Sequence, residues 1–285
     1  MKYIKMTLDY IKSNRIALFL HAIIPAILFA VFISPTSIIE YVIRKPEYYE
    51  GNSFIDILRA MFDLSQRLGM SVLQIIGIVL SIIIIAIILS SLVGNIENKM
   101  LYGQTVYPGF KGVIKRININ FLSVLSCMFT FTLALFTIYI VLSLLFFIFA
   151  HIHIRWLYLL LSFVFGIVCF GIFVVGLTFT ILAIPNMTIR GFGISNASKK
   201  SSYTVVNNYW KVFASIVLPM IVIYIPVVLV AIFDYPGKLA VNIVVRFFFY
   251  LAAIMYYVPL FYVEFFDLEE MDRVDLKKNK YWEEL

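Results

Sequence analysis

The sequence predicts an all-α integral membrane protein with six transmembrane helices and short cytoplasmic amphipathic helices lying at the membrane interface. Three observations predict this class. Of the 285 residues, 62% are hydrophobic and only 14% are charged, and the mean hydropathy is +0.98, which is not the composition of a water-soluble domain. The charged residues gather in short clusters between long uncharged runs. Those runs are continuously apolar, without the alternation of a transmembrane β-barrel.

Six segments are long enough to cross a bilayer as helices, because about 20 apolar residues span about 30 Å of hydrocarbon. The predicted spans cover residues 16–35, 68–94, 118–150, 156–185, 210–233 and 240–265. The third and fourth are long enough to tilt strongly or to project from the membrane. The chain is therefore predicted to be a single polytopic membrane domain that ends in an acidic cytoplasmic tail, residues 266–285.

The distribution of Lys and Arg predicts the orientation, because cytoplasmic loops carry the excess of positive charge. With the N-terminus inside, 16 of the 23 Lys and Arg residues fall in inside segments and 7 fall outside. Each of the four inside segments holds four of them, so both termini are predicted to be cytoplasmic. Topology and anionic lipid headgroups explain the net charge of +7, and no nucleic-acid partner is expected.

A cleaved signal peptide is the alternative interpretation of the first 35 residues. The long basic region and the absence of a small-x-small cleavage site between Phe29 and Ile33 favour a membrane span instead. Cys127 and Cys169 both fall inside predicted spans, where we expect small packing residues and no disulfide.

A short basic amphipathic segment followed by polar residues and a span occurs three times. The copies are YIKMTLDYIKSNRIALFLHAIIPAI from Tyr3, YPGFKGVIKRININFLSVLSCMFTF from Tyr107 and GISNASKKSSYTVVNNYWKVFASIVLPMI from Gly193. In the first two copies the apolar residues recur at the helical spacing i, i+3, i+4, i+7, away from the lysines. Such a segment is expected to lie in the membrane interface as a helix. The alternative is that its basic residues serve topology alone.

An asparagine in each copy is expected to mark the bend into the span, because its amide satisfies backbone groups where one helix stops and the next starts. These residues are Asn14, Asn120 and Asn208. The basic and aromatic residues of the second and third copies are expected to contact lipid headgroups or a protein partner. They are Lys111, Lys115, Arg116, Lys199, Lys200, Trp210 and Lys211.

Residues 195–213, SNASKKSSYTVVNNYWKVF, lead into a span through an Asn-x-Trp-x-x-Phe motif. The stretch resembles the cytoplasmic segment of a diffuse group of bacterial six-span proteins, which includes the membrane domain attached to some glycerophosphoryl diester phosphodiesterases and its stand-alone relatives. Residues 107–122 are similar to the matching segment in the first half of that group. The resemblance covers about the last 180 residues and implies an all-helical fold in a bacterial cell membrane. It implies no activity, because the hydrolase chemistry of that group belongs to a separate soluble domain.

Ionisable residues near the spans are few. We expect His21 to be hydrogen-bonded to a neighbouring helix, and Arg246 and Glu264 to snorkel toward the interfaces. His151 and His153, spaced i, i+2 without an acidic companion, do not predict a metal site. Catalytic and phosphate-binding motifs are absent. The sequence therefore predicts no enzymatic activity and no cofactor.

Prolines and small residues indicate the shapes of the spans. Pro219 and Pro226 are candidate kink positions on one face of the fifth span, where they would line the path of a transporter, although such kinks also occur in inert bundles. The pairs Ser90/Gly94 and Ser162/Gly166 have the i, i+4 spacing that permits close helix contact. Residues 35–67 are expected to include an interfacial helix over the outer leaflet.

Three functions remain open. The sequence favours a non-enzymatic scaffold or accessory subunit that engages membrane lipids or a protein partner through its cytoplasmic helices. The second is a permease subunit of a transport complex, in which those helices would dock an ATPase subunit. The third is an intramembrane enzyme acting on lipid, which would require His21, Glu264 and Arg190 to converge. The sequence specifies neither substrate nor oligomeric state.

Overall fold

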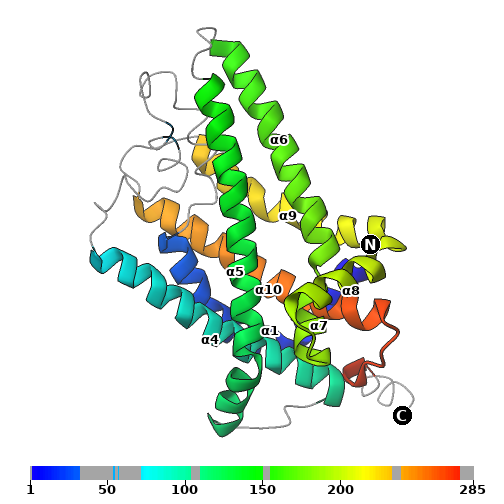
Figure 1. Cartoon of the computed structure of the whole chain (residues 1–285). Coiled ribbons are helices and arrows are strands. Elements are labelled where there is room, and N and C mark those ends of the chain that lie inside the picture. Colours follow the sequence, from blue (N-terminus) through cyan, green and yellow to red (C-terminus); the bar gives the residue numbers. More distant parts are fainter. Residues whose placement is uncertain are drawn as a thin grey trace.

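The chain folds into long helices joined by turns. A computed structural model describes residues 2–32, 54, 57, 72–103, 110–149, 155–232 and 239–276, and these contain no strand. In chain order the helices are α1 (Lys2–Phe32), α4 (Val72–Tyr102), α5 (Phe110–Phe149), α6 (Arg155–Thr180), α7 (Ala183–Arg190), α8 (Ile194–Val206), α9 (Tyr209–Ile232) and α10 (Leu239–Leu268). Figure 1 shows their arrangement. The all-helical prediction is confirmed.

Within the described residues, six stretches are long and apolar enough to cross a membrane, as predicted. They are Lys2–Val31, Val79–Tyr102, Lys111–Phe149, Trp156–Arg190, Tyr209–Leu229 and Asn242–Leu268. The helices extend beyond the predicted spans at several ends. Helix α5 begins at Phe110, before residue 118, and α4 continues to Tyr102, past residue 94. The fourth stretch contains two helices, since α6 ends at Thr180 and α7 follows it.

Helix α5 is longer than a bilayer requires. Its 40 residues correspond to about 60 Å at 1.5 Å per residue, twice the roughly 30 Å of hydrocarbon in a bilayer. Figure 1 shows its first turns reaching past α4 at the lower end of the molecule. A tilted or projecting helix was predicted for this segment.

The centre of the fold is the packing of α1 against α10. Ala22, Ala26 and Ala30 recur every four residues along α1 and are buried. A face of alanines lets two helix backbones approach closely, which is how helices associate where water drives no packing. Leu260 and Tyr262 of α10 belong to the same buried cluster.

Helix α4 crosses α5 at Gly94. A Cβ placed on Gly94 would lie 2.9 Å from the side-chain nitrogen of Asn120 and 3.0 Å from the Cβ of Arg116. The close contact predicted from Ser90/Gly94 is therefore present. In the second predicted pair Ser162 is buried, but a Cβ on Gly166 would meet nothing within 4 Å, so Gly166 makes no such contact.

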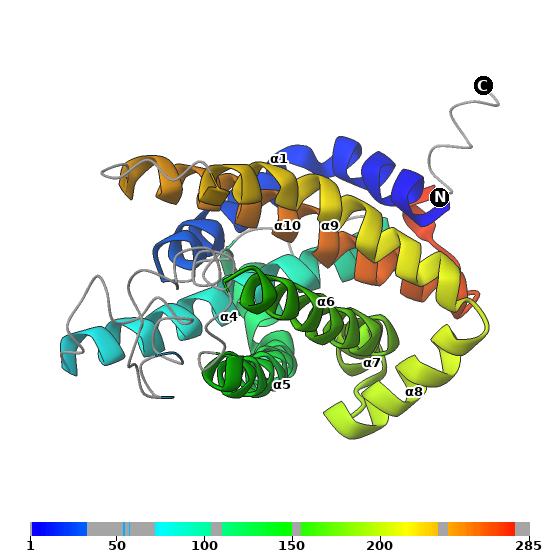
Figure 2. The ribbon, with the colours of Figure 1, turned by 90° about the horizontal axis from the view of Figure 1, so that it is seen from above.

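The hairpin of α5 and α6 stands apart from this centre over much of its length (Figures 1 and 2). A second buried cluster, which includes Leu142, Phe146 and Tyr158, joins the two helices near their connection. Large apolar side chains along both helices are exposed, Phe136 and Phe163 among them. Such a surface suits hydrocarbon rather than water.

The predicted bends have mixed outcomes. Asn14 has a non-helical backbone (φ −123°, ψ 17°) that kinks α1, and Asn208 lies in the turn between α8 and α9, as expected. Asn120 lies inside the uninterrupted α5, so the bend predicted there was wrong. Its side chain is buried against α4 instead. The external segment, apart from Phe54 and Ile57, and the pair His151 and His153 fall outside the described residues.

Candidate functional site

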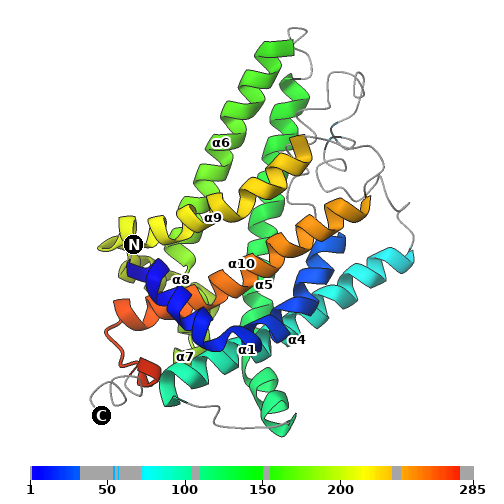
Figure 3. The ribbon, with the colours of Figure 1, turned by 180° about the vertical axis from the view of Figure 1, so that it is seen from behind.

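Polar side chains concentrate at one end of the helix bundle. Figure 3 shows the first turns of α1, helices α7 and α8, the start of α9 and the end of α10 together there. The start of α1 and the end of α10 are joined by an ion pair in which the Nζ of Lys2 contacts both carboxylate oxygens of Asp267, at 2.6 and 2.8 Å. Both terminal segments therefore lie on the same side of the molecule.

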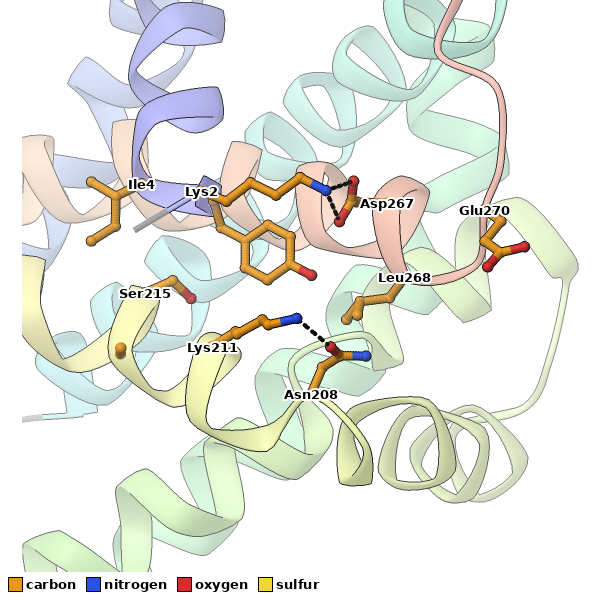
Figure 4. Close-up of a pocket in the computed structure, with 10 residues that line it drawn as sticks. Lys2, Ile4, Asn208, Lys211, Ser215, Asp267, Leu268 and Glu270 are labelled. Atoms are coloured by element: carbon orange, nitrogen blue, oxygen red, sulfur yellow. Dashed lines mark hydrogen bonds and ion pairs between the residues drawn. The ribbon is translucent and has the colours of Figure 1, made fainter.

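A cavity of about 340 Å³ opens between α1, α9 and α10 at this end (Figure 4). Its polar lining consists of Lys2, Tyr3, Asn208, Lys211, Ser215, Asp267 and Glu270. The lining thus carries two cations and two anions. In Figure 4 the side chains of Lys2 and Lys211 extend in the same direction, toward the end of α10. The Nζ of Lys211 donates a hydrogen bond to Oδ1 of Asn208 at 3.2 Å.

A buried carboxyl group lies behind the cavity wall. Glu264 of α10 is 0% exposed, and one of its oxygens accepts a hydrogen bond from the hydroxyl of Ser215. The other carboxyl oxygen has no hydrogen-bond partner among the residues that the structure describes. The expectation that Glu264 snorkels to the interface was wrong, because α9 covers it. Arg246 is also buried, so its predicted snorkelling was wrong as well.

A second polar network joins α7, α8 and the end of α10 around Glu269. One carboxylate oxygen lies 2.5 Å from Nη2 of Arg190, and the other accepts a hydrogen bond from Thr204 at 2.6 Å and lies 3.6 Å from Nζ of Lys200. Burial raises the pKa of Glu269, but the hydrogen bonds from Thr204 and Arg190 and the charges of Arg190 and Lys200 outweigh it, so the pKa is lowered. Glu269 therefore holds α7, α8 and α10 together as a carboxylate.

The corner where α8 meets α9 has exposed aromatic and basic side chains. Trp210 is 76% exposed and Tyr203 is 80% exposed, and Lys199 and Lys211 are exposed beside them in the sequence. We call these four residues the α8–α9 corner. Lys200, predicted to act with them, also forms an ion pair with Glu269. The buried face of α8, which includes Ser201, packs inward, where the Ser201 hydroxyl donates to the carbonyl of Phe179 at 2.7 Å.

The predicted basic residues of α5 divide between two environments. Lys111 and Lys115 are exposed in the first turns of the helix. Arg116 is only 8% exposed and packs against Gly94 of α4. Arg116 therefore contacts the neighbouring helix, and its expected contact with lipid headgroups or a partner stays a prediction.

Pro219 and Pro226 lie inside α9, which is helical from Tyr209 to Ile232. Pro219 lacks the N–H that would bond to the carbonyl of Ser215, and the hydroxyl of Tyr256 donates to this oxygen at 3.1 Å. Pro226 is exposed on the outside of the bundle. The two prolines therefore do not line an internal path together.

The three residues of the hypothetical intramembrane enzyme have different partners. His21 lies 3.3 Å from the hydroxyl of Ser91 on α4, which confirms the expected hydrogen bond to a neighbouring helix. Arg190 binds Glu269, and Glu264 binds the hydroxyl of Ser215. Among the residues that the structure describes, no group of three or more His, Cys, Asp or Glu side chains could hold a metal ion.

Sequence reasoning did not identify the cavity. Lys2 contributed only to the prediction of membrane orientation. Asp267, Glu269 and Glu270 were treated only as part of an acidic tail. A basic N-terminal segment and an acidic C-terminal segment on the same predicted side were a signal that the two attract. The sequence could not indicate which residues pair, because 265 residues separate Lys2 from Asp267.

Comparison with known proteins gives no match to a family model, a curated protein or a solved structure. The function is therefore inferred from the residues themselves.

Proposed function

We propose that this chain is a non-enzymatic integral membrane protein of a bacterial plasma membrane, with both termini in the cytoplasm, that serves as a scaffold or accessory subunit. In this proposal the α8–α9 corner lies in the headgroup layer of the inner leaflet and engages lipid headgroups or a partner. The proposal includes membership of the six-span group that residues 195–213 resemble.

The observation that carries the proposal is the exposure of Trp210 and Tyr203 together with Lys199 and Lys211. Large aromatic side chains that are mostly exposed are costly in water but favourable at the boundary between hydrocarbon and headgroups, where a ring has one apolar and one polar side. Lysines beside them meet lipid phosphates. Polar side chains of the neighbouring helices are paired inward, as in the Glu269 network.

The depth of Trp210 in a bilayer tests the proposal. The chain has three tryptophans, so the double variant W156F/W282F leaves Trp210 as the only fluorophore. In liposomes its fluorescence is expected to be quenched more by a spin label on the lipid headgroup than by bromine atoms deep in the acyl chains. As a depth control, Phe170→Trp in a tryptophan-free background is expected to show the opposite order, because Phe170 is exposed in the middle of α6. A Trp210 that neither quencher reaches would contradict the proposal.

Orientation is tested separately by reporter fusions. A reporter that is active only in the cytoplasm is expected to work when fused after Leu285 and to be silent when inserted near Glu47. The reverse pattern would reject the cytoplasmic location of the α8–α9 corner.

A permease subunit is the second candidate, and one observation favours it. The first turns of α5 project with Lys111, Ile114 and Lys115 exposed, as a docking helix for an ATPase would. Cross-linking of this segment to a co-purifying ATPase would support transport. Loss of a membrane complex without any change in flux, after removal of these charges, would support the scaffold.

A further inference from the structure

We infer that the cavity between α1, α9 and α10 binds the headgroup of a zwitterionic aminophospholipid, with the phosphate at Lys211 and the ammonium at Glu270. The inference rests on the proposed function, because it assumes that this end of the bundle lies in the headgroup layer. It goes further by naming a lipid class and a specific site.

The size and charge of the cavity favour a small ligand that carries both a positive and a negative charge. Its volume of about 340 Å³ falls in the range of small-molecule sites, roughly 300–1,000 Å³. Lys2 and Lys211 provide two positive charges, and Asp267 and Glu270 provide two negative charges. A ligand with a single negative charge would meet both carboxylates, whereas a dipolar ligand finds an opposite charge for each of its ends.

The ion pairs and hydrogen bonds of the charged side chains in the cavity show which of these charges remain for a ligand. Lys2 and Asp267 neutralise each other through two contacts. Lys211 donates to the neutral amide oxygen of Asn208, so its ammonium keeps donors for a phosphate. The Glu270 side chain is exposed, and among the described residues its carboxylate forms no ion pair. Lys211 and Glu270 are therefore the two charges that a bound headgroup would satisfy.

The backbone conformation of Glu270 is a second reason to assign this residue to the site. Helix α10 ends with Glu270 in the left-handed region (φ 51°), and the N–H of Met271 bonds to the carbonyl of Phe266 at 2.9 Å. This cap favours glycine, because a side chain there clashes with the backbone. A glutamate at such a position costs stability, and Glu270 is among the residues that line the cavity.

The surroundings favour a lipid over a soluble zwitterion. Ile4, Ala214 and Leu268 add apolar surface to the lining. Trp210, next to Lys211, is the residue proposed to lie at the headgroup level. A phospholipid would present phosphate and ammonium at the cavity while its acyl chains stay in the bilayer.

The test measures the affinity of the purified protein for four probes by native mass spectrometry in mild detergent. They are phosphatidylethanolamine, N-acetyl-phosphatidylethanolamine, phosphatidylglycerol and water-soluble glycerophosphoethanolamine. Phosphatidylethanolamine is expected to bind about tenfold more tightly than its N-acetylated form or phosphatidylglycerol, since only it carries the ammonium. Binding of glycerophosphoethanolamine at equal affinity would assign the site to a soluble ligand and overturn the lipid inference.

Variants identify the residues. Glu270→Gln is expected to remove the preference for phosphatidylethanolamine over its N-acetylated form, and Lys211→Gln is expected to weaken binding of both. The matched controls Asp9→Asn and Lys12→Gln remove exposed charges outside the cavity and outside the α8–α9 corner, and should leave the preference intact. Glu270→Gly is the decisive variant. It should preserve or raise thermal stability at its left-handed backbone while losing the preference, so the loss cannot come from misfolding.

Equal binding of the three lipids, or an equal loss of preference in Asp9→Asn, would overturn the inference. The depth of Trp210 reports position rather than headgroup choice. A Trp210 at the headgroup level without lipid preference therefore rejects this inference alone, and a Trp210 in water rejects the proposed function.

Discussion

The hydroxyl of Tyr256 on α10 donates a hydrogen bond at 3.1 Å to the carbonyl oxygen of Ser215 on α9. This is the carbonyl that Pro219, four residues later, leaves without a helical donor. The adjacent Tyr257 donates to the carbonyl of Ile216 at 2.8 Å. Tyr256 thus supplies the donor that Pro219 lacks, where lipid would offer no substitute for water, and Tyr257 adds a second bond between the two helices.

The coupling between Tyr256 and Pro219 can be measured by a double-mutant cycle. Tyr256→Phe is expected to lower the free energy of unfolding by about 0.5–1.5 kcal/mol. In a Pro219→Ala background the restored N–H can bond to the Ser215 carbonyl, so the same substitution should cost less. Unfolding in mixed detergent micelles gives these free energies.

Tyr257→Phe is the matched control for this cycle. Its acceptor, the carbonyl of Ile216, has the N–H of Met220 four residues later, so its cost should be the same in the unmodified chain and in the Pro219→Ala background. An undiminished cost of Tyr256→Phe in that background would show that the hydroxyl does not replace the missing donor.

Gly94 and Gly166 are predicted to respond in opposite ways to alanine. At Gly94 the new Cβ would lie 3.0 Å and 3.1 Å from Cβ and Cγ of Arg116, so α5 would have to move away from α4. Overpacking of this kind costs about 1–3 kcal/mol. At Gly166 the Cβ meets nothing within 4 Å, and Gly166→Ala is expected to be neutral or stabilising by up to about 1 kcal/mol. Unfolding in micelles measures both, and equal effects would contradict the close crossing at Gly94.

Glu269 predicts a dependence of stability on pH. Its pKa in the folded chain is lowered below the ordinary value for Glu, about 4.3. A carboxyl of this kind contributes stability that is fully present above its unfolded-state pKa and is lost as the pH falls through the folded-state pKa. Acid should therefore loosen the contact of α10 with α7 and α8.

The variant Glu269→Gln tests this dependence. At pH 7 it should lower the free energy of unfolding by about 1.5–3 kcal/mol, the contribution of a hydrogen bond to a charged group. The difference from the unmodified chain should shrink as the pH falls below about 4, because the wild-type carboxyl is then protonated too. Asp9→Asn, at an exposed position, should show no comparable change. A difference that stays constant down to about pH 3 would mean that Glu269 acts through packing rather than charge.

The sequence was informative where one residue's local chemistry decides the structure. Asn14 bends α1 and Asn208 lies at a helix junction, because amide side chains suit a backbone that leaves the helix. The same reasoning failed at Asn120. There the neighbouring helix decided the outcome, since α4 approaches at Gly94 and buries the amide in a continuous helix.

The candidate site could not be predicted from the sequence for a related reason. Lys211 was identified from its position beside Trp210, but Asp267 and Glu270 were indistinguishable from other acids of the tail. Arg116 and Lys115 are adjacent and chemically similar, yet one is buried and the other exposed. Periodicity places residues on a face of a helix, but it does not say which neighbour covers that face.

The sequence by itself determined the number of apolar helices and their approximate limits, because the length and continuity of an apolar run are properties of a single segment. The tertiary structure alone decided the pairing of Lys2 with Asp267, the burial of Glu264 behind Ser215 and the cavity between α1, α9 and α10. The physical reason is that lipid does not select among apolar helix faces. Which helices pack together is set by small residues and polar contacts at a few positions, and these are visible only when both helices are in place.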